Sequence, residues 1–362
     1  AFQKAIRSLE KGRYGLGFVK NFNELSKDEL LKKLITPSSE RHFIMYEALR
    51  KGATVDEIHE ITKVKKYFIE QMQELVQEEE ALIANKGKLP SDEALIKAKK
   101  DGFSDKYLSQ ILGITEDEIR NKRIELGLEQ AWDKVHVSGT KDSSYYYSTY
   151  NAKDNNPVKS DKKKVMILGG GPNRIGQGIE FDYCCVHAAM SLKKLGFETI
   201  IVNCNPETVS TDYDTSDKLY FEPLTLEDVL SIYKKENPVG VIAQFGGQTP
   251  LNLAAELQAN GVKILGTSPE VIDLAEDRAR FDALLERFGI RRPRGHGVNT
   301  LEEAMNAAEE LGYPVLLRPS YVIGGQNMCI SRDPETTEIY MRGILAGGIE
   351  NPVLVDKYMP GI

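Results

Sequence analysis

A glycine-rich turn between a short apolar run and a helix constrains this chain more than any other stretch of its sequence. Residues 165–168, Val-Met-Ile-Leu, are apolar throughout, as in a strand of a parallel sheet that is buried on both faces. Five glycines follow within residues 169–178, and glycine lets a backbone turn tightly and approach a neighbouring surface. Residues 181–195 then show helical spacing of small and apolar side chains. This order predicts the opening of an α/β fold, whose ligand binds beyond the carboxyl end of the strand.

The turn does not match the common phosphate-binding loops. Gly171 and Gly176 have the spacing of a Walker loop, but Gln177 and Gly178 stand where Lys and Ser/Thr are needed. No register of the turn gives Gly-x-Gly-x-x-Gly either. The sequence therefore argues against a P-loop kinase and an ordinary NAD dehydrogenase, and a turn with only a structural role remains an alternative.

Strands and helices alternate after the turn. The expected strands are residues 198–203, 239–245 and 262–265, and the expected helices are residues 225–235 and 250–259. This alternation predicts a parallel sheet with right-handed crossovers. Polar or glycine-rich sequence follows every strand. Because the carboxyl ends of parallel strands meet at one edge of a sheet, we expect one continuous crevice there.

The sequence from about Ser26 to Leu128 is helical in pattern. Ser26 with Glu29, and Thr115 with Glu118, have the spacing of capping boxes. Residues 52–72 and 102–123 resemble each other, and each predicts a glycine, a short helix, a tight turn and a second helix. Paired helix-turn-helix units could bind DNA. Acidic residues surround the few basic ones, however, so we favour a helical packing or oligomerisation domain.

A polar segment, residues 141–164, separates the helical part from the sheet. It contains a tyrosine cluster (Tyr145, Tyr146, Tyr147 and Tyr150), then an Asn-Asn-Pro sequence and a lysine run. We interpret this segment as a linker. The tyrosine rings are expected to pack against a neighbouring domain rather than to stack on bases.

The pattern changes again at Asp277. The expected helices are residues 278–288 and 301–311, and the expected strands are residues 314–317, 328–331 and 353–357. The first of these strands leads into Arg318, and Gly324 and Gly325 follow in the next turn. A cationic side chain followed by flexible backbone amides suits a phosphate group. A hairpin with an exposed arginine is the alternative.

Composition restricts the class of protein. The length of 362 residues is enough for two or three domains. A net charge of -7 and a pI near 5.5 argue against general nucleic-acid binding. The sequence has no apolar run of the roughly 20 residues that a membrane helix needs, and no signal peptide, so we expect a cytoplasmic protein. The four cysteines include no Cys-x-x-Cys pair and the five histidines are scattered, so no metal cluster is visible.

Several long motifs resemble a known family, the large chain of bacterial-type carbamoyl-phosphate synthase. They occupy residues 169–188, 202–223, 245–254, 266–281 and 318–328. They are similar to the second half of that chain, the half that forms carbamoyl phosphate. Residues 53–76 and 101–123 resemble its oligomerisation domain.

The resemblance implies a fold class and a domain order. The fold class is α/β plus all-α: a helical oligomerisation domain, a Rossmann-like parallel α/β pre-ATP-grasp domain and an incomplete ATP-grasp domain. The first residue is not Met, and we expect the chain to be a segment of a larger polypeptide. The implied segments are the tail of a preceding ATP-grasp half (1–15), the helical domain (16–150), a linker (151–164), the pre-ATP-grasp domain (165–276) and the first lobe of an ATP-grasp domain (277–362).

The resemblance also implies an activity. The family is an ATP-dependent, glutamine-hydrolysing ligase that makes carbamoyl phosphate from bicarbonate, ammonia and two ATP for arginine and pyrimidine biosynthesis. This half would phosphorylate carbamate. The implied cofactors are ATP and Mg²⁺ or Mn²⁺, with K⁺ as an additional candidate. The implied partners are a glutaminase small subunit and further copies of the chain, bound through the helical domain, with no nucleic acid and no membrane.

Site residues follow from the matched motifs. By resemblance, Arg318 would be catalytic and would bind ATP. The other implied ATP-binding residues are Arg278, Gly324, Gly325, Lys357 and Met359, of which the last two would contact adenine. Glu180 and Glu207 would lie along the carbamate tunnel.

What the resemblance places outside this sequence also matters. Metal ligands are expected beyond Ile362, so none is assigned in this chain. The isolated chain is therefore expected to be inactive and to bind ATP weakly or not at all. A biotin-carboxylase-like ligase and a non-catalytic interaction module built on the helical domain are the alternatives.

Overall fold

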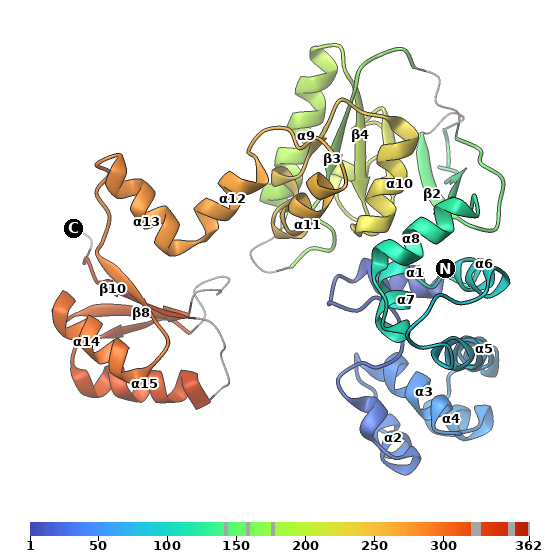
Figure 1. Cartoon of the computed structure of the whole chain (residues 1–362), viewed down its shortest axis with the longest axis horizontal. Coiled ribbons are helices and arrows are strands. Elements are labelled where there is room, and N and C mark those ends of the chain that lie inside the picture. The colour runs from blue at the N-terminus through green and yellow to red at the C-terminus, as the bar shows by residue number, and fades with distance from the viewer. Residues whose placement is uncertain (141–143, 157–159, 175–177, 320–326, 347–351, 361–362) are drawn as a thin grey trace. The chain divides into compact units, whose positions relative to one another are not determined.

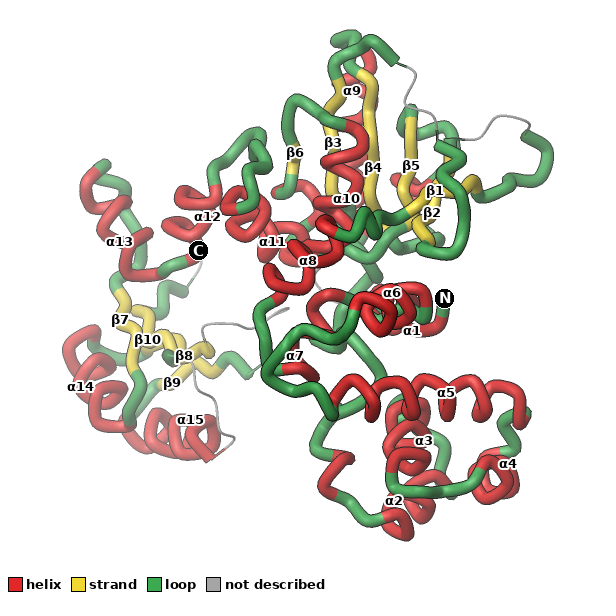
Figure 2. Tube along the Cα trace, turned by 45° about the vertical axis from the view of Figure 1, so that its right-hand side comes forward, coloured by secondary structure: helices red, strands yellow, loops and turns green. Residues whose placement is uncertain are grey.

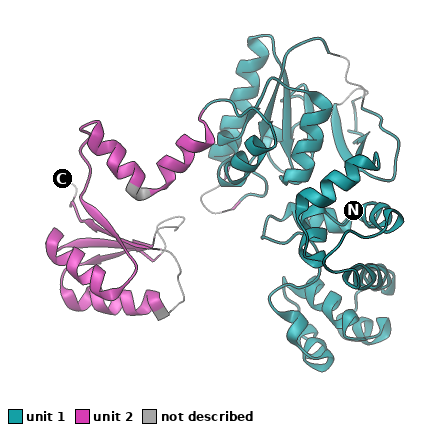
Figure 3. Cartoon of the chain, viewed as in Figure 1, with its two compact units in different colours: residues 1–173, 179–266 teal, residues 174–178, 267–362 magenta. Residues whose placement is uncertain are grey.

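The computed structural model describes residues 1–140, 144–156, 160–174, 178–319, 327–346 and 352–360. The chain divides into two compact units: residues 1–173 with 179–266, and residues 174–178 with 267–362 (Figures 1 and 3). None of the helices in the described ranges combines the length and the hydropathy of a membrane-spanning segment.

The first unit begins with short helices. They are α1 (Phe2–Ser8), the 3-10 helix η1 (Phe22–Glu24), α2 (Lys27–Leu34), α3 (Arg41–Arg50), α4 (Val55–Thr62), α5 (Lys66–Ile83), α6 (Asp92–Lys100), α7 (Asp105–Leu112) and α8 (Glu116–Glu125). The predicted repeat is confirmed: α4 with α5, and α7 with α8, each follow a glycine whose φ is positive, Gly52 and Gly102.

Local signals explain where these helices start. Ser26 and Thr115 accept hydrogen bonds from the backbone of Glu29 and Glu118, and both predicted capping boxes are complete. The helices pack into two apolar cores, one mainly from α2 to α5 and one mainly from α6 to α8. Buried Glu79 on α5 joins the two, because Tyr46 on α3 and Tyr107 on α7 donate to its carboxylate at 2.6 and 2.9 Å.

A six-stranded sheet follows the helices in the same unit. Its strands are β1 (Ala131–Lys134), β2 (Tyr145–Thr149), β3 (Lys164–Leu168), β4 (Glu198–Asn203), β5 (Lys218–Phe221) and β6 (Val241–Ile242). The order is β1-β2-β5-β4-β3-β6. Neighbouring strands from β2 to β6 are parallel and β1 is antiparallel to β2, so the predicted parallel sheet is confirmed.

Helices cover both faces of this sheet (Figure 2). The helical elements are α9 (Ile179–Lys194), η2 (Val209–Thr211), α10 (Leu226–Glu236), η3 (Gln244–Gly246) and α11 (Gln248–Ala259). Met166 and Leu168 of β3 face a core shared with α10 and α11. Ile167 faces the opposite core, which contains Cys185 and Ala189 of α9. All five residues of β3 are buried, as the apolar run predicts.

The interpretation of residues 141–164 as a linker is wrong for the tyrosine cluster. Tyr145 and Tyr146 belong to β2 and pair with Leu219 and Tyr220 of β5. Their burial alternates along the strand, which is the pattern of a half-buried strand. The rings pack against a neighbouring strand of the same sheet rather than against a neighbouring domain, since the centroid of the Tyr145 ring lies 4.5 Å from that of Phe221 on β5.

Two predicted strands are shorter than expected. The strand at residues 239–245 is reduced to β6, because η3 begins at Gln244. The strand at residues 262–265 is reduced to a single parallel bridge between Val241 and Ile264. The sheet therefore ends at β6.

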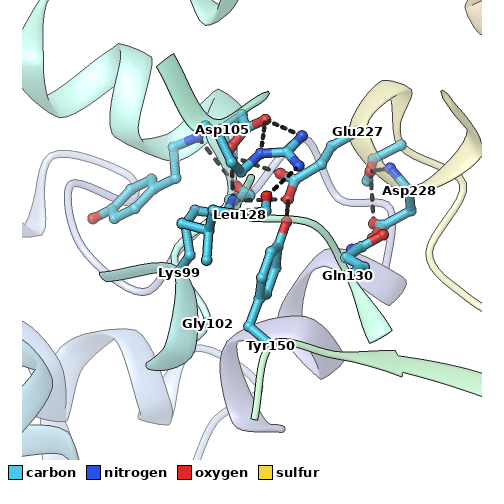
Figure 4. Close-up of polar contacts among 12 residues, drawn as sticks. Lys99, Gly102, Asp105, Leu128, Gln130, Tyr150, Glu227 and Asp228 are labelled. Carbon is cyan, nitrogen blue, oxygen red and sulfur yellow. Dashed lines mark hydrogen bonds and ion pairs between the residues drawn. The ribbon is translucent and has the colours of Figure 1, made fainter. Parts of the chain in front are cut away.

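A buried ionic cluster joins the helical part of the first unit to its sheet (Figure 4). Lys99 on α6 donates to Asp105 and to Glu227 at 2.7 Å each. Tyr150 donates to Glu227 at 2.9 Å, and Arg123 pairs with Asp105 at 3.0 Å. Burial favours a raised pKa for Glu227, but the charges of Lys99 and Arg123 outweigh it and hold that pKa well below its ordinary value.

The second unit contains an antiparallel sheet backed by helices. Its elements are α12 (Pro269–Glu276), α13 (Arg278–Arg287), β7 (Gly295–Val298), α14 (Leu301–Leu311), β8 (Val315–Pro319), β9 (Cys329–Ser331), α15 (Pro334–Ala346) and β10 (Val353–Lys357). The strand order is β7-β10-β8-β9. Val315, Leu317, Val353 and Val355 share one core with α14 and α15, so both helices cover the same face.

Candidate functional site

Polar and glycine residues meet at the carboxyl ends of β3, β4 and β6, where the crevice is predicted. The amide side chain of Asn203, at the end of β4, accepts hydrogen bonds from the backbone of Gly171 at 3.0 Å and Cys204 at 2.9 Å. Its amide nitrogen donates to Ser210 at 3.3 Å. Asn203 is 1% exposed, so it ties the glycine turn to the loop after β4.

The backbones after β3 and β6 lie so close together that only glycine fits. A Cβ atom at Gly246 would lie 2.5 Å from the carbonyl oxygen of Leu168, and closer still to that of Gly169. At Gly169, a Cβ atom would lie 2.6 Å from the side-chain carbon of Asn203. The glycines therefore bring three strand ends into van der Waals contact.

Sequence reasoning missed one carboxylate at this edge, that of Glu10. Its Oε2 accepts a hydrogen bond from the Thr249 hydroxyl at 2.7 Å. A Cβ atom at Gly171 would lie 2.7 Å from the Glu10 carboxyl carbon. No local pattern could have identified Glu10, because the residues that it contacts are more than a hundred positions away in the sequence.

Glu180 and Glu207, the predicted tunnel residues, are both exposed. Glu180 lies in the first turn of α9, where the helix dipole favours an anion. The backbone N–H of Glu207 donates to the side chain of Asn205 at 2.9 Å, so Asn205 organises this turn. Both glutamates follow the strand ends of the first unit, and their role in a tunnel stays a prediction.

The basic residues of the second helical repeat are paired with carboxylates. Arg120 pairs with Asp117. Lys122 lies 3.1 Å from a carboxylate oxygen of Asp92, and Arg123 pairs with Asp105 as described above. These three cations are already neutralised locally, which does not favour phosphate-backbone contacts with DNA.

Arg318, the predicted catalytic residue, lies on β8 in the second unit. Its Nε donates to the carboxylate of Asp356 on β10 at 3.1 Å. Arg318 stands opposite Leu354, and Asp356 is two residues further along β10, so the two side chains form a diagonal pair on one face. Among the described residues, the terminal nitrogens of Arg318 form no hydrogen bond. The contact with Asp356 therefore orients the guanidinium, and no residue in the described ranges engages its two terminal nitrogens.

Lys357 and Met359 lie at and beyond the end of β10. Lys357 stands opposite Val315, on the face that α14 and α15 cover, and its amine donates to the carbonyl of Gly312 at 2.7 Å. Arg318 lies on the other face of the sheet, so the structure does not bring these two side chains together. Met359 is 67% exposed.

The other predicted nucleotide-binding residues are Arg278, Gly324 and Gly325. Arg278 begins α13, but its side chain lies outside the described part of the structure. Gly324 and Gly325 also lie outside the described residues. Their contacts with a nucleotide, and a cleft shared with Arg318, stay predictions.

The described side chains form no cluster of metal ligands. Over the described ranges, no three His, Cys, Asp or Glu side chains gather as a metal ion would require. The described residues therefore indicate no magnesium site.

Three family models match consecutive parts of the chain. The carbamoyl-phosphate synthetase large chain oligomerisation domain matches residues 1–127. The carbamoyl phosphate synthase preATP-grasp domain matches residues 161–274. The ATP binding domain of the carbamoyl-phosphate synthase L chain matches residues 277–362.

Curated relatives match the whole length of the chain. The carbamoyl phosphate synthase large chain of Archaeoglobus fulgidus is 52% identical over 99% of this chain and 34% of the relative. That of Neisseria meningitidis serogroup B is 49% identical over 99% of this chain and 33% of the relative. The chain therefore spans about a third of the length of the curated relatives that it matches.

Solved structures are more distant. The biotin carboxylase domain of Hydrogenobacter thermophilus 2-oxoglutarate carboxylase covers 56% of this chain and 45% of its own, with 24% identity and a TM-score of 0.43. This low similarity does not indicate what the chain does.

Proposed function

Because this chain belongs to the carbamoyl phosphate synthase large-chain family, we propose that it is part of an ATP-dependent ligase that forms carbamoyl phosphate. The longer protein would consume bicarbonate, ammonia and two ATP. The part that contains this chain would phosphorylate carbamate. The observation that carries the proposal is the identity of about half of all residues to carbamoyl phosphate synthase large chains over 99% of the chain.

Arg318 is the proposed phosphate-binding and catalytic residue. Phosphoryl transfer depends on positioning and on stabilising negative charge. A guanidinium held at Nε by Asp356, with its terminal nitrogens available, can supply both through two parallel hydrogen bonds. Arg278, Gly324 and Gly325 are proposed to contribute further phosphate contacts.

We assign the adenine contacts to the end of β10. The amine of Lys357 donates to the carbonyl of Gly312, and its backbone N–H donates to the carbonyl of Arg294 at 2.8 Å, so its backbone carbonyl would contact adenine. The exposed thioether of Met359 would pack on the ring, since a flexible and polarisable side chain adapts well to an aromatic surface.

The strand-end crevice of the first unit is the proposed path of carbamate. Carbamate decomposes in water, so its delivery requires a route from which water is excluded. Glu180 and Glu207 would line this route as polar walls rather than act as bases. The buried contacts of Asn203 and the close approach at Gly246 would keep the wall rigid.

Family membership also supports further proposals. They are self-association through the helical part, ammonia supply by a glutaminase small subunit, Mg²⁺ or Mn²⁺ as the metal, K⁺ as a further ion, and a cytoplasmic location. The segments 1–15, 16–150, 151–164, 165–276 and 277–362 are the proposed domains. Since the chain spans about a third of the length of its curated relatives, metal ligands would come from other parts of the longer protein, and this chain alone would be inactive.

The stoichiometry of the longer protein tests the proposed reaction. The full-length large chain that contains this sequence would receive bicarbonate, ammonium and Mg·ATP. ADP and carbamoyl phosphate would then be quantified, the latter after enzymatic transfer of its carbamoyl group to ornithine. We expect two ADP for each carbamoyl phosphate. A single ADP per product, or no carbamoyl phosphate, would contradict the proposal.

A further inference from the structure

The α1 segment, which consists of α1 and the two residues after it (residues 2–10), lies along the carboxyl edge of the six-stranded sheet. Lys4 donates to the backbone carbonyl of Ser148 at 2.9 Å, near the end of β2, and to Glu222, which directly follows β5, at 2.7 Å. The carbonyl of Ser8 accepts a hydrogen bond from the thiol of Cys204 at 3.5 Å, directly after β4. The segment therefore covers the ends of three strands, in the order in which the sheet arranges them.

Glu10 extends this cover to the ends of β3 and β6. Its Oε2 accepts a hydrogen bond from the Thr249 hydroxyl at 2.7 Å, in the first turn of α11, the helix that follows β6. Its other carboxylate oxygen is buried and lies against Gly171, in the turn after β3. A Cβ atom at Gly171 would overlap the carboxylate, so the side chain of Glu10 fills the space between the glycine turn and the start of α11.

Glu10 stands at a backbone position where glycine is usual. Its φ is 49°, in the left-handed region, and it directly follows the C-cap of α1. A residue other than glycine costs free energy in this region, and it persists where surrounding contacts determine its conformation. The contacts with Gly171 and Thr249 are of this kind. A glutamate here therefore does more than end the helix, because its side chain joins two strand ends.

Another face of α1 is fixed to the helical part of the unit. The side chain of Gln3 donates to the carbonyl of Asp101 at 3.0 Å, and that of Arg7 donates to the carbonyl of Gly102 at 2.9 Å. Gln3, Ile6 and Arg7 are at most 7% exposed. The α1 segment is thus held between the helical part and the sheet edge, and it cannot leave the strand ends without breaking buried contacts.

We propose that the α1 segment closes the strand-end crevice against water, and that Glu10 is a positioning residue for the delivery of carbamate. This inference rests on the proposed function, in which carbamate passes along this edge. Glu10 would act through Gly171 and Thr249, by holding the glycine turn against the start of α11. Water breaks the C–N bond of carbamate and gives ammonia and bicarbonate, so a gap at this contact would waste the ATP already spent on carbamate.

The ratio of ADP to carbamoyl phosphate tests this role in the full-length large chain, supplied with bicarbonate, ammonium and Mg·ATP. Glu10→Ala empties the space beside Gly171, and we expect the ratio to rise at least about twofold over the wild type, because leaked carbamate consumes ATP without product. Glu10→Gln keeps the volume and an acceptor oxygen for Thr249, so its ratio should stay close to that of the wild type. The matched control is Glu256→Ala, an exposed glutamate on α11, which should behave like the wild type.

The reverse reaction separates this role from a merely structural one. ATP formation from Mg·ADP and carbamoyl phosphate needs no delivery of carbamate, so Glu10→Ala should retain the wild-type rate. Thr249→Val removes only the hydroxyl donor and should also raise the ADP ratio. It decides alone if Glu10→Ala does not fold.

Three results would overturn the role of Glu10. They are a wild-type ratio in Glu10→Ala or, where that protein does not fold, in Thr249→Val; a Glu10→Gln protein that wastes as much ATP as Glu10→Ala; and a reverse reaction that falls together with the forward one. A wild type that forms no carbamoyl phosphate would instead overturn the proposed function, and this inference with it. The two failures are therefore distinguishable.

Discussion

At the scale of single residues, the most informative contacts join positions that are far apart in the sequence. Lys4 and Glu222, Glu10 and Thr249, and Lys99 and Glu227 are each separated by more than a hundred residues. The sequence alone places the glycines, Asn203 and Glu207 at strand ends, because these residues directly follow apolar runs. It does not predict which lysine or arginine pairs with which carboxylate, because those pairs depend on how the helical part packs on the sheet.

Glu222 should make stability depend on pH. Burial raises the pKa of its carboxyl to about 7, and the charge of Asp228 adds to the shift although Lys4 opposes it. Since the folded pKa lies above the ordinary value near 4.5, this group's stabilising contribution is complete below pH 4.5. It is lost as pH rises through 7, and it amounts to at most ~3 kcal/mol.

The variant Glu222→Gln isolates this contribution. Glutamine cannot ionise, so the difference in unfolding free energy between wild type and variant should shrink or change sign as pH rises from 4.5 to 7.5. Urea unfolding at several pH values, followed by the fluorescence of Trp132, measures the difference. A difference that stays constant across this range would show that Glu222 does not titrate there.

At the scale of elements, sequence patterns predicted most helices and the central strands. The strands at residues 198–203 and 353–357 and the helix at residues 301–311 have the predicted bounds. The capping boxes also formed as predicted, because their hydrogen bonds join residues only three positions apart.

The strand β2 was missed for a physical reason. Its sequence is mostly tyrosine with Ser and Thr, and its apolar contacts come from Tyr220 and Phe221 of β5, which only the fold brings close. Tyrosine and threonine are, however, enriched in strands, and that signal could have identified it.

The close approach of β3 and the segment after β6 predicts a strong effect of a single methyl group. Gly246→Ala places a Cβ atom against the Leu168 and Gly169 carbonyls, so we expect a loss of about 1–3 kcal/mol in unfolding free energy.

The matched variant is Gly343→Ala on α15, where nothing lies within 4 Å of the new atom. That change should be neutral or stabilising by up to about 1 kcal/mol. Calorimetry measures the unfolding free energy of both variants. A Gly246→Ala protein as stable as the wild type would contradict the close packing described for this edge.

At the scale of the whole molecule, the first unit is expected to unfold as one cooperative body. The cluster around Glu227 joins the helical part to the sheet, and removing one partner of a buried ion pair typically costs about 3–5 kcal/mol. Glu227→Ala should therefore lower the urea midpoint reported by Trp132, which packs in the sheet. Glu60→Ala removes one member of a pair whose side chains are both 71% exposed, and it should change little.

Two results would contradict this account of the first unit. One is an unaltered midpoint in Glu227→Ala. The other is a wild-type helical signal at 222 nm that is lost well before the fluorescence of Trp132 changes.

The whole-molecule organisation was partly predictable. Motif resemblance and the three family models agree on a helical part, a sheet part and a nucleotide-binding part. The exact boundaries were not predictable from local patterns, because β1 and β2 lie far from β5 in sequence and complete its sheet.

The most direct test of the central claim is the reverse reaction, ATP formation from Mg·ADP and carbamoyl phosphate, in the full-length large chain. If Arg318 holds the transferred phosphate, Arg318→Ala should slow this reaction by about a hundredfold or more, as the loss of a charge-stabilising donor does. Bicarbonate-dependent ATP hydrolysis would use the other of the two proposed ATP molecules, so it should be retained. The control Arg342→Ala removes an exposed arginine of α15 that pairs with Glu338, and both activities should be unchanged. An Arg318→Ala protein that forms ATP at the wild-type rate would contradict the account.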